Sequence, residues 1–164
     1  MKSKQFYKER YHPQYKLSKA NIRLYNTILN LDVNTIFEFG CGIGRHLHRL
    51  EGMGYNCFGV DISKDCIREA KQHGLNVKVG DETSLSKFKP RDLVFTNSVL
   101  CHIENIDEAL KNLKALSSKY LLMFECINKE GEHWYIHNYP GKEILTIDSH
   151  LEEGRTYKLF LCEF

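Results

Sequence analysis

Hydrophobic and polar positions follow two different periods along the chain, and together they predict strands separated by helices. Short apolar, β-branched and aromatic runs predict buried strands, whereas apolar residues three or four positions apart predict helices that bury one face. The expected strands are 35–39, 55–60, 76–79, 92–96, 120–127, 144–148 and 156–164. The expected helices are 18–30, a segment after residue 44 that ends near Gly52 or Gly54, 63–73 and 103–116.

The order of these elements predicts the fold class. Strands that alternate with helices indicate an α/β protein with a doubly wound, mostly parallel seven-stranded sheet. The last two strands, joined by a turn at Glu153-Gly154, predict an antiparallel hairpin at the sheet edge. Ser18 is expected to cap the first helix. The apolar side chains of this helix expected to face the core are Ile22, Tyr25, Ile28 and Leu29.

The most informative segment is a strand that runs into three alternating glycines. The expected strand 35–39 is followed by Gly40, Gly42 and Gly44, and then by a helical pattern. Glycine has no Cβ, so its backbone can approach a ligand closely, and strand, glycine turn and helix open nucleotide-binding βαβ units. A dinucleotide fingerprint would place its third glycine at Arg45, and no G-K-[ST] of a P-loop is present. The alternative is a tight turn without a ligand.

Composition narrows the class further. A chain of 164 residues predicts a single domain, and its six cysteines contain no C-x-x-C pair. We therefore expect reduced, mostly buried thiols in a cytoplasmic protein rather than a disulfide framework or a zinc site. The polar start of the chain and the lack of a run of about 18 apolar residues predict no leader and no membrane span. His46 and His48, two apart on a helix, predict no metal site.

Charge is distributed unevenly along the chain. Residues 1–23 hold seven Lys and Arg against one acid, a net charge of +6, which leaves −4 for the remainder. A basic, aromatic arm with its helix at 1–33 would serve as a substrate lid or a packing helix before a core at 34–164. The positive charge indicates either a solvated surface or attraction of an anionic substrate.

Four blocks, in order, resemble class I S-adenosylmethionine (SAM) methyltransferases. They are Glu38-Phe-Gly-Cys-Gly-Ile-Gly44, Gly59-Val-Asp-Ile-Ser63, Val79-Gly-Asp-Glu82 and the segment from Asp92 to His102. The resemblance spans residues 34–127 and implies SAM as the cofactor on a Rossmann-like sheet whose C-terminal part is shortened. More loosely, the arm with Tyr11 and the segments 17–29, 95–125 and 133–144 resemble methylases associated with pseudaminic acid biosynthesis.

The resemblance also implies a cofactor site at the carboxyl ends of the strands. The implied cofactor-binding residues are Glu38, Gly40, Cys41, Gly42, Gly44, Asp61, Ile62, Asp81, Glu82, Asn97 and Ser98. Glu38 would lie near the amino group of the cofactor, Asp61 would accept the ribose hydroxyls and Asp81 the adenine amine. Local alternatives are a cap of the loop amides for Glu38, a helix cap for Asp61 and a turn residue for Asp81.

The sequence offers fewer candidate residues for catalysis and acceptor binding than for cofactor binding. His102 follows the fourth strand and is the candidate general base, because histidine exchanges protons near neutral pH, with a structural role as the alternative. Tyr11, His133 and Tyr135 are candidate substrate contacts, although the segment 133–139 would equally pack over the sheet. The fourth strand does not end in N-P-P-Y, and Cys101 does not follow a proline, which argues against DNA-base methylation.

The sequence thus predicts a SAM-dependent methyltransferase acting on an oxygen or nitrogen of a small polar, sugar-type acceptor. The expected partner is this small molecule, with no membrane, and the protein is either a monomer or a homodimer. One alternative is a nucleic-acid or protein methyltransferase, whose binding through the basic arm would weaken steeply with salt. Another is a catalytically silent SAM-binding partner protein. A nicotinamide-dependent enzyme is disfavoured by Arg45 at the third glycine position.

Overall fold

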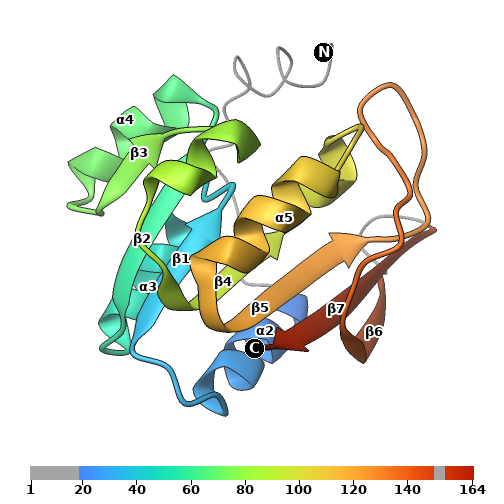
Figure 1. The fold of residues 1–164 in the computed structure, drawn as a ribbon, viewed down its shortest axis with the longest axis horizontal. Helices are drawn as coiled ribbons and strands as arrows, with labels where there is room; N and C mark the ends of the chain where they lie inside the picture. The colour runs from blue at the N-terminus through green and yellow to red at the C-terminus, as the bar shows by residue number, and fades with distance from the viewer. Residues whose placement is uncertain (1–18, 150–153) are drawn as a thin grey trace.

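The computed structural model describes residues 19–149 and 154–164, and its strands form one mixed sheet in the order β3-β2-β1-β4-β5-β7-β6 (Figure 1). The strands are β1 Thr35–Phe39, β2 Asn56–Asp61, β3 Val77–Val79, β4 Arg91–Asn97, β5 Ser117–Cys126, β6 Lys142–Ser149 and β7 Arg155–Glu163. β1 to β5 pair in parallel, whereas β7 is antiparallel to both β5 and β6. The predicted mostly parallel sheet with an antiparallel edge hairpin is therefore confirmed.

The parallel pairing brings the carboxyl ends of β1, β2, β4 and β5 to one edge of the sheet. β1 lies between β2 and β4, with Phe37 opposite both Phe58 and Val94. The segments that follow these strands consequently lie side by side, although they are far apart in the sequence. This edge is where ligands bind in open α/β sheets.

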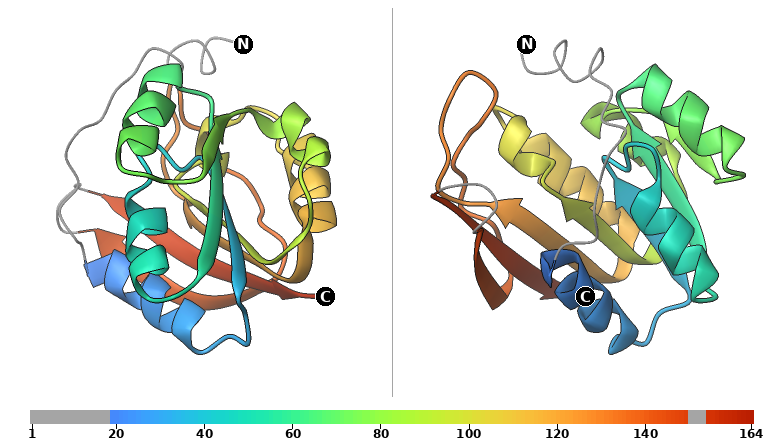
Figure 2. Two further views of the ribbon diagram at one scale, coloured as in Figure 1. Left: turned by 90° about the vertical axis from the view of Figure 1, so that its left-hand side faces the viewer. Right: turned by 180° about the vertical axis from the view of Figure 1, so that it is seen from behind.

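Helices cover both faces of the sheet (Figure 2). The helices are α2 Lys19–Leu29, α3 Arg45–Gly52, α4 Lys64–Gln72 and α5 Asp107–Leu116, with 3-10 turns η1 Glu82–Lys87 and η2 Leu100–His102. Figure 2 shows α2, α3 and α4 on one side, and α5 on the other. Over residues 19–149 and 154–164, every helix is too short or too polar to cross a membrane.

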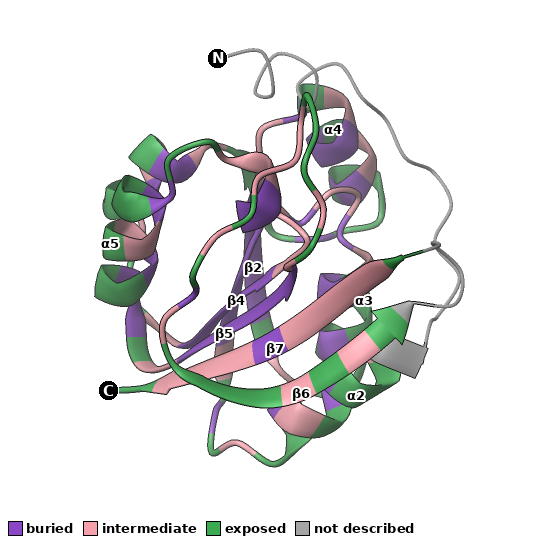
Figure 3. Cartoon of the chain, turned by 90° about the vertical axis from the view of Figure 1, so that its right-hand side faces the viewer, coloured by how far each residue is buried: buried purple, intermediate pink, exposed green. Residues whose placement is uncertain are grey.

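Two hydrophobic clusters hold these layers together, one on each face of the sheet. Leu24 of α2, Leu47 of α3 and Phe95 of β4 are fully or almost fully buried in the first cluster, and Leu113 of α5 packs with Met123 of β5 in the second. The strands at the centre of the sheet are buried, whereas β6 is largely exposed (Figure 3). All six cysteines are free thiols, five of them buried, as the sequence predicts.

The first helix buries a different stripe from the predicted one. Ser18, its predicted cap, lies outside the described residues. Leu24, Tyr25 and Ile28 are buried, but Ile22 and Leu29 are 44% and 53% exposed, so their predicted core positions are wrong. At 100° per residue the three buried side chains span about 100° of the helix surface, and Leu29 and Ile22 lie about 40° and 60° beyond one edge of that face. The sheet contacts only a narrow stripe of this helix.

The predicted helix 103–116 begins four residues later, at Asp107. Hydrogen bonds from the segment after β5 hold the preceding backbone: the amide of Tyr135 donates to the carbonyl of Cys101 (2.8 Å), and His137 Nε2 donates to the carbonyl of Ile103 (2.8 Å). The carbonyl of Ile103 is one that the predicted helix would use for itself. Tertiary contacts therefore override the local helical pattern, and His102 ends η2 instead of opening α5.

Candidate functional site

The glycine turn after β1 is fastened to β2. The amides of Gly40 and Cys41 both donate to the carbonyl of Val60 (2.8 and 3.0 Å), and the amide of Gly44 donates to the carbonyl of Cys41 (2.8 Å). All three glycines have positive φ, between 54° and 78°. L-residues adopt this left-handed conformation only with strain, so the turn requires glycine.

Alanine substitutions separate backbone strain from crowding in this turn. A Cβ on Gly40 would lie 2.2 Å from Cγ2 of Val99, whereas a Cβ on Gly42 would have no neighbour within 4 Å. We expect Gly40→Ala to lower the free energy of unfolding by about 3 kcal/mol, from strain and overpacking together. The matched control Gly42→Ala should cost about 1 kcal/mol, from strain alone. Urea unfolding followed by circular dichroism measures both, and equal losses would contradict the crowding argument.

Asp61, the last residue of β2, connects that strand to the glycine turn. Its Oδ2 accepts a hydrogen bond from the amide of Gly42, and its Oδ1 accepts one from the amide of Ser63, each at 2.8 Å. Ser63 itself caps α4, because its Oγ accepts from the amide of Cys66 (3.3 Å). Burial raises the pKa of Asp61, and its backbone hydrogen bonds oppose that rise. A carboxylate offers about four acceptor positions, so the two amides leave capacity for a ligand.

Glu38 is the penultimate residue of β1 and is 1% exposed. Within the described part of the chain its Oε2 is buried without a hydrogen-bond partner. Burial raises the pKa of Glu38 well above its usual value, and the charge of Asp61 raises it further. A buried polar atom without a partner is costly. A cationic group of a bound ligand would give this oxygen the hydrogen-bond donor that it lacks.

Asp81 follows β3 and caps η1. Its Oδ1 accepts from the amide of Thr83 (3.2 Å) and from the Thr83 hydroxyl (2.7 Å), while Ser84 Oγ accepts from the Asp81 amide (3.0 Å). Asp81 therefore has the role of a turn residue, which the sequence analysis named as the alternative to adenine binding. The neighbouring Glu82 is buried, and its carbonyl accepts from the side chain of Asn112 (2.9 Å).

A buried carboxylate that the sequence analysis missed shapes the loop after β4. Glu125 of β5 is fully buried, and it accepts hydrogen bonds from Thr96 Oγ1 (2.7 Å) and from the amides of Val99 (3.0 Å) and Cys101 (3.2 Å). Between these donors the chain turns sharply at Ser98, which has φ of 57°. The sequence did contain a sign of this role, because Glu125 is the single acidic residue in the apolar run 120–127.

On the far side of the loop, His102 contacts the segment after β5. His102 Nδ1 lies 2.7 Å from the carbonyl of His133. A carbonyl only accepts, so Nδ1 carries the proton and Nε2 is the basic nitrogen of the neutral ring. The ring meets Trp134 edge-on at 4.2 Å between centroids. Lys129 Nζ and the guanidinium of Arg155 lie 4.6 and 4.7 Å from the centre of the same indole.

The structure brings together only some of the predicted acceptor residues. His133 and Tyr135 are half-buried beside His102, whereas Tyr139 is buried against Phe160, with ring centroids 5.4 Å apart. The segment 133–139 therefore packs at its end and leaves its beginning accessible. Tyr11 lies outside the described residues.

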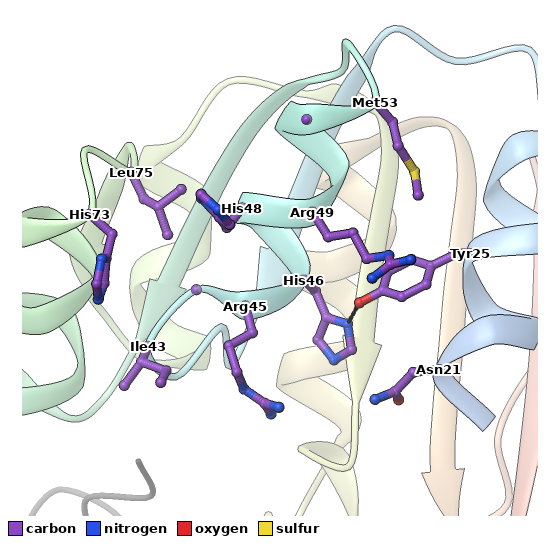
Figure 4. Close-up of a pocket in the computed structure, with 12 residues that line it drawn as sticks. Asn21, Tyr25, Ile43, Arg45, His46, His48, Arg49, Met53, His73 and Leu75 are labelled. Atoms are coloured by element: carbon purple, nitrogen blue, oxygen red, sulfur yellow. Dashed lines mark hydrogen bonds between the residues drawn. The ribbon is translucent and has the colours of Figure 1, made fainter. Parts of the chain in front are cut away.

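A cavity of about 690 Å³ lies beside α3. It is lined by residues of α2, of the glycine turn, of α3 and of the segment after α4: Asn21, Tyr25, Ile43, Gly44, Arg45, His46, His48, Arg49, Gly52, Met53, His73 and Leu75 (Figure 4). Gly44 is the one predicted cofactor residue in this lining, so the cavity adjoins the predicted site without coinciding with it. Figure 4 also shows that His46 points toward Tyr25, away from His48.

Comparisons with known proteins agree with this architecture. The family described as Methyltransferase domain matches residues 37–119, half of the chain. No curated protein matches. The magnesium protoporphyrin IX methyltransferase of Synechocystis PCC 6803, solved with SAM bound, is similar in fold, with 15% identity and a TM-score of 0.70 over 98% of this chain and 96% of that chain. A SAM-dependent methyltransferase from Archaeoglobus fulgidus has 16% identity and a TM-score of 0.66 over 87% and 92%.

These neighbours share the fold, and the family match covers the strands and turns that form the edge described above. Its span runs from Phe37 in β1 to Lys119 in β5, and so includes the glycine turn, Asp61, Asp81 and the loop after β4. The chain therefore belongs to the methyltransferase domain family and is a SAM-dependent methyltransferase.

Proposed function

We propose that SAM binds at the carboxyl edge of β1, β2 and β4, across the glycine turn. Glu38 Oε2 would receive the amino group of the cofactor, Asp61 the ribose hydroxyls and Asp81 the adenine amine. The observation that carries the proposal is the buried Glu38 oxygen without a partner, on the strand next to the one that ends at Asp61. A cationic amino group and a pair of hydroxyls complement these two carboxylates.

Gly40, Cys41, Gly42 and Gly44 would lie under the methionine and sugar portions, because their backbone can approach a ligand closely. Ile62 and Glu82 would flank the ribose and the base. Asn97 and Ser98, at the end of β4, would lie beside the methyl group. For residues 1–33, a substrate lid or a packing helix stays a prediction.

For the reaction, we propose transfer to an oxygen or nitrogen of a small polar, sugar-type acceptor. When bound, SAM supplies an electrophilic methyl group on a sulfonium. The methyl carbon–sulfur bond would break as the acceptor atom takes the methyl group, S-adenosylhomocysteine would leave, and the proton of the acceptor O–H or N–H would pass to Nε2 of His102. The hydrogen bond from His102 Nδ1 to the carbonyl of His133 supports this role, since it leaves Nε2 as the basic nitrogen. His133 and Tyr135 would contact the acceptor.

The proton on Glu38 makes SAM binding dependent on pH. Burial raises the pKa of Glu38, and a cationic amino group bound beside it would favour the charged carboxylate, so SAM binding should displace the Glu38 proton. We expect proton release on SAM binding at pH values below the raised pKa, and an affinity that rises with pH up to that pKa. Above about pH 8 the affinity should fall, because the amino group loses its own charge. Calorimetry in buffers of different ionisation enthalpy measures the proton count.

The control for this prediction distinguishes Glu38 from other acids near the turn. Glu38→Gln should bind SAM more weakly and release no proton, whereas Glu51→Gln, on the exposed side of α3, should behave like the wild type. Undiminished proton release in Glu38→Gln would assign the proton to another group.

Calorimetric titration of the full chain with SAM, with S-adenosylhomocysteine and with NAD tests the proposed site. Binding of the first two but not of NAD supports it, and no SAM binding by folded protein overturns it. Transfer of labelled methyl from SAM to nucleotide sugars, then to nucleic acids and proteins, tests the acceptor. Labelled nucleic acid or protein would replace the small-acceptor proposal, and binding without any transfer would indicate a silent partner protein.

A further inference from the structure

A buried histidine outside the predicted set joins three elements of the fold. His46, the second residue of α3, is 7% exposed. Its Nδ1 lies 2.7 Å from the hydroxyl of Tyr25 on α2, and its Nε2 lies 2.8 Å from Nδ2 of Asn97 at the end of β4. Figure 4 shows the ring of His46 directed at Tyr25. Phe95 meets the same ring edge-on, with centroids 6.0 Å apart.

The direction of these hydrogen bonds follows from the groups involved. An amide nitrogen only donates, so Asn97 Nδ2 donates to His46 Nε2. The single proton of the neutral ring then lies on Nδ1 and is donated to the oxygen of Tyr25. The amide orientation agrees with a second contact, in which Ser98 Oγ donates to Asn97 Oδ1 (3.3 Å). Burial lowers the pKa of His46 to about 4, which keeps the ring neutral at physiological pH.

The two ends of this chain of hydrogen bonds differ in accessibility. Tyr25 and His46 are buried, whereas Asn97 is half-exposed at the carboxyl edge of the sheet. The amide of Asn97 is therefore the end that a ligand at the carboxyl edge of the sheet can reach. The orientation of this amide is fixed by His46, which a ligand at the carboxyl edge would not need to contact.

We propose that His46 is a positioning residue for the cofactor site: by accepting from Asn97 it sets the rotation of that amide, while the oxygen of Tyr25 accepts the proton of His46 Nδ1 and holds the ring in place. The proposal rests on the proposed function, which places Asn97 beside the methyl group. The Asn97 amide has two orientations related by a half-turn, and only one of them places Oδ1 on the side opposite His46. If that orientation is already fixed in the free protein, SAM binding does not have to lose conformational entropy to select it.

Two substitutions at His46 separate positioning from a purely structural role. The amide of glutamine reaches about as far as Nε2 of histidine, and the shorter asparagine about as far as Nδ1. His46→Gln therefore keeps the contact to Asn97 and loses the one to Tyr25, while His46→Asn does the reverse. Both remove the ring from the same buried position, so a structural role predicts similar losses of thermal stability and of SAM affinity in the two variants.

Calorimetric titration of the full chain with SAM, beside thermal unfolding, measures the difference. We expect His46→Gln to bind within about twofold of the wild type and His46→Asn about fivefold more weakly. Equal affinities in the two variants would overturn the proposal. If wild-type protein binds no SAM, the proposed function fails and this inference fails with it. Binding that is insensitive to His46 rejects the inference alone.

A spectroscopic measurement keeps the test decisive if the variants do not fold. Nitrogen NMR of the wild-type protein labelled at histidine should show His46 as a neutral ring with its proton on Nδ1. Tyr25→Phe removes one hydroxyl and should shift His46 toward a mixture of tautomers, with SAM affinity reduced about twofold. A proton on Nε2 in the wild type would contradict the direction of the hydrogen bonds and overturn the proposal.

Discussion

Replacing Asp61 with alanine should weaken SAM binding about a hundredfold. The carboxylate accepts from the amides of Gly42 and Ser63, and we propose that it also accepts the ribose hydroxyls. Alanine removes both functions, so the ligand loses its hydroxyl partners and the amide of Gly42 loses its acceptor, while the backbone bonds from Gly40 and Cys41 to Val60 remain. Hydrogen bonds to a charged group contribute about 1.5–3 kcal/mol each, which makes about 2.7 kcal/mol a conservative expectation.

Calorimetric titration of the purified variant gives this affinity directly. Asp61→Asn keeps one carbonyl oxygen and should lie between alanine and the wild type. Asp65→Ala, on the exposed start of α4 where the carboxylate pairs with Arg68 (2.7 Å), is the matched control and should bind normally. Unchanged affinity in folded Asp61→Ala would remove Asp61 from the site.

Replacing Glu125 with alanine should destabilise the fold by about 3 kcal/mol or more. The fully buried carboxylate satisfies the amides of Val99 and Cys101 and the hydroxyl of Thr96. Alanine leaves these donors buried without an acceptor and opens a cavity between β5 and the loop after β4. The same loop carries Ser98 with its positive φ, so its geometry should loosen together with the loss of stability.

Urea unfolding at neutral pH measures this loss, with SAM affinity as the second readout. Glu125→Gln keeps one acceptor oxygen and should be less destabilised than Glu125→Ala. Glu143→Ala removes an exposed carboxylate paired with Lys158 (2.7 Å) and serves as the control. A stability of Glu125→Ala equal to that of the control would show that water or another group replaces the carboxylate.

The pH dependence of folding provides an independent check on Glu125. Burial raises its pKa in the folded protein above the value in the unfolded chain, against the opposing hydrogen bonds. The folded state then holds the proton more tightly, so this group contributes stability at low pH that is lost as pH rises through its folded pKa. Glu125→Ala should lack that contribution.

Much of the fold could be predicted from the sequence because its signals are local. The apolar runs define the strands, the glycines at 40, 42 and 44 define a turn that needs positive φ, and Ser63 caps the helix that follows β2. Asp61 could be singled out for the same reason, since it ends an apolar run two residues before that cap. In each case, the residues that determine the conformation are neighbours along the chain.

Where prediction failed, contacts between distant segments decided the conformation. The start of α5 moved to Asp107 because the segment after β5 holds the backbone near Cys101, about thirty residues before it in the sequence. Ile22 and Leu29 became exposed because the sheet covers only part of α2. Periodicity specifies which residues share a helix face, but not how much of that face a neighbouring element covers.

By itself the sequence determined the fold class, the family and the set of residues at the carboxyl ends of the strands. It did so because glycine conformation, strand patterning and parallel connectivity are encoded within short segments. The tertiary structure alone decided that Glu125 holds the loop after β4, that Nδ1 of His102 faces the carbonyl of His133 and that His46 joins Tyr25 to Asn97. Those hydrogen bonds join residues 21 to 51 positions apart, and pairing over such separations exists only once the sheet has brought the strand ends together.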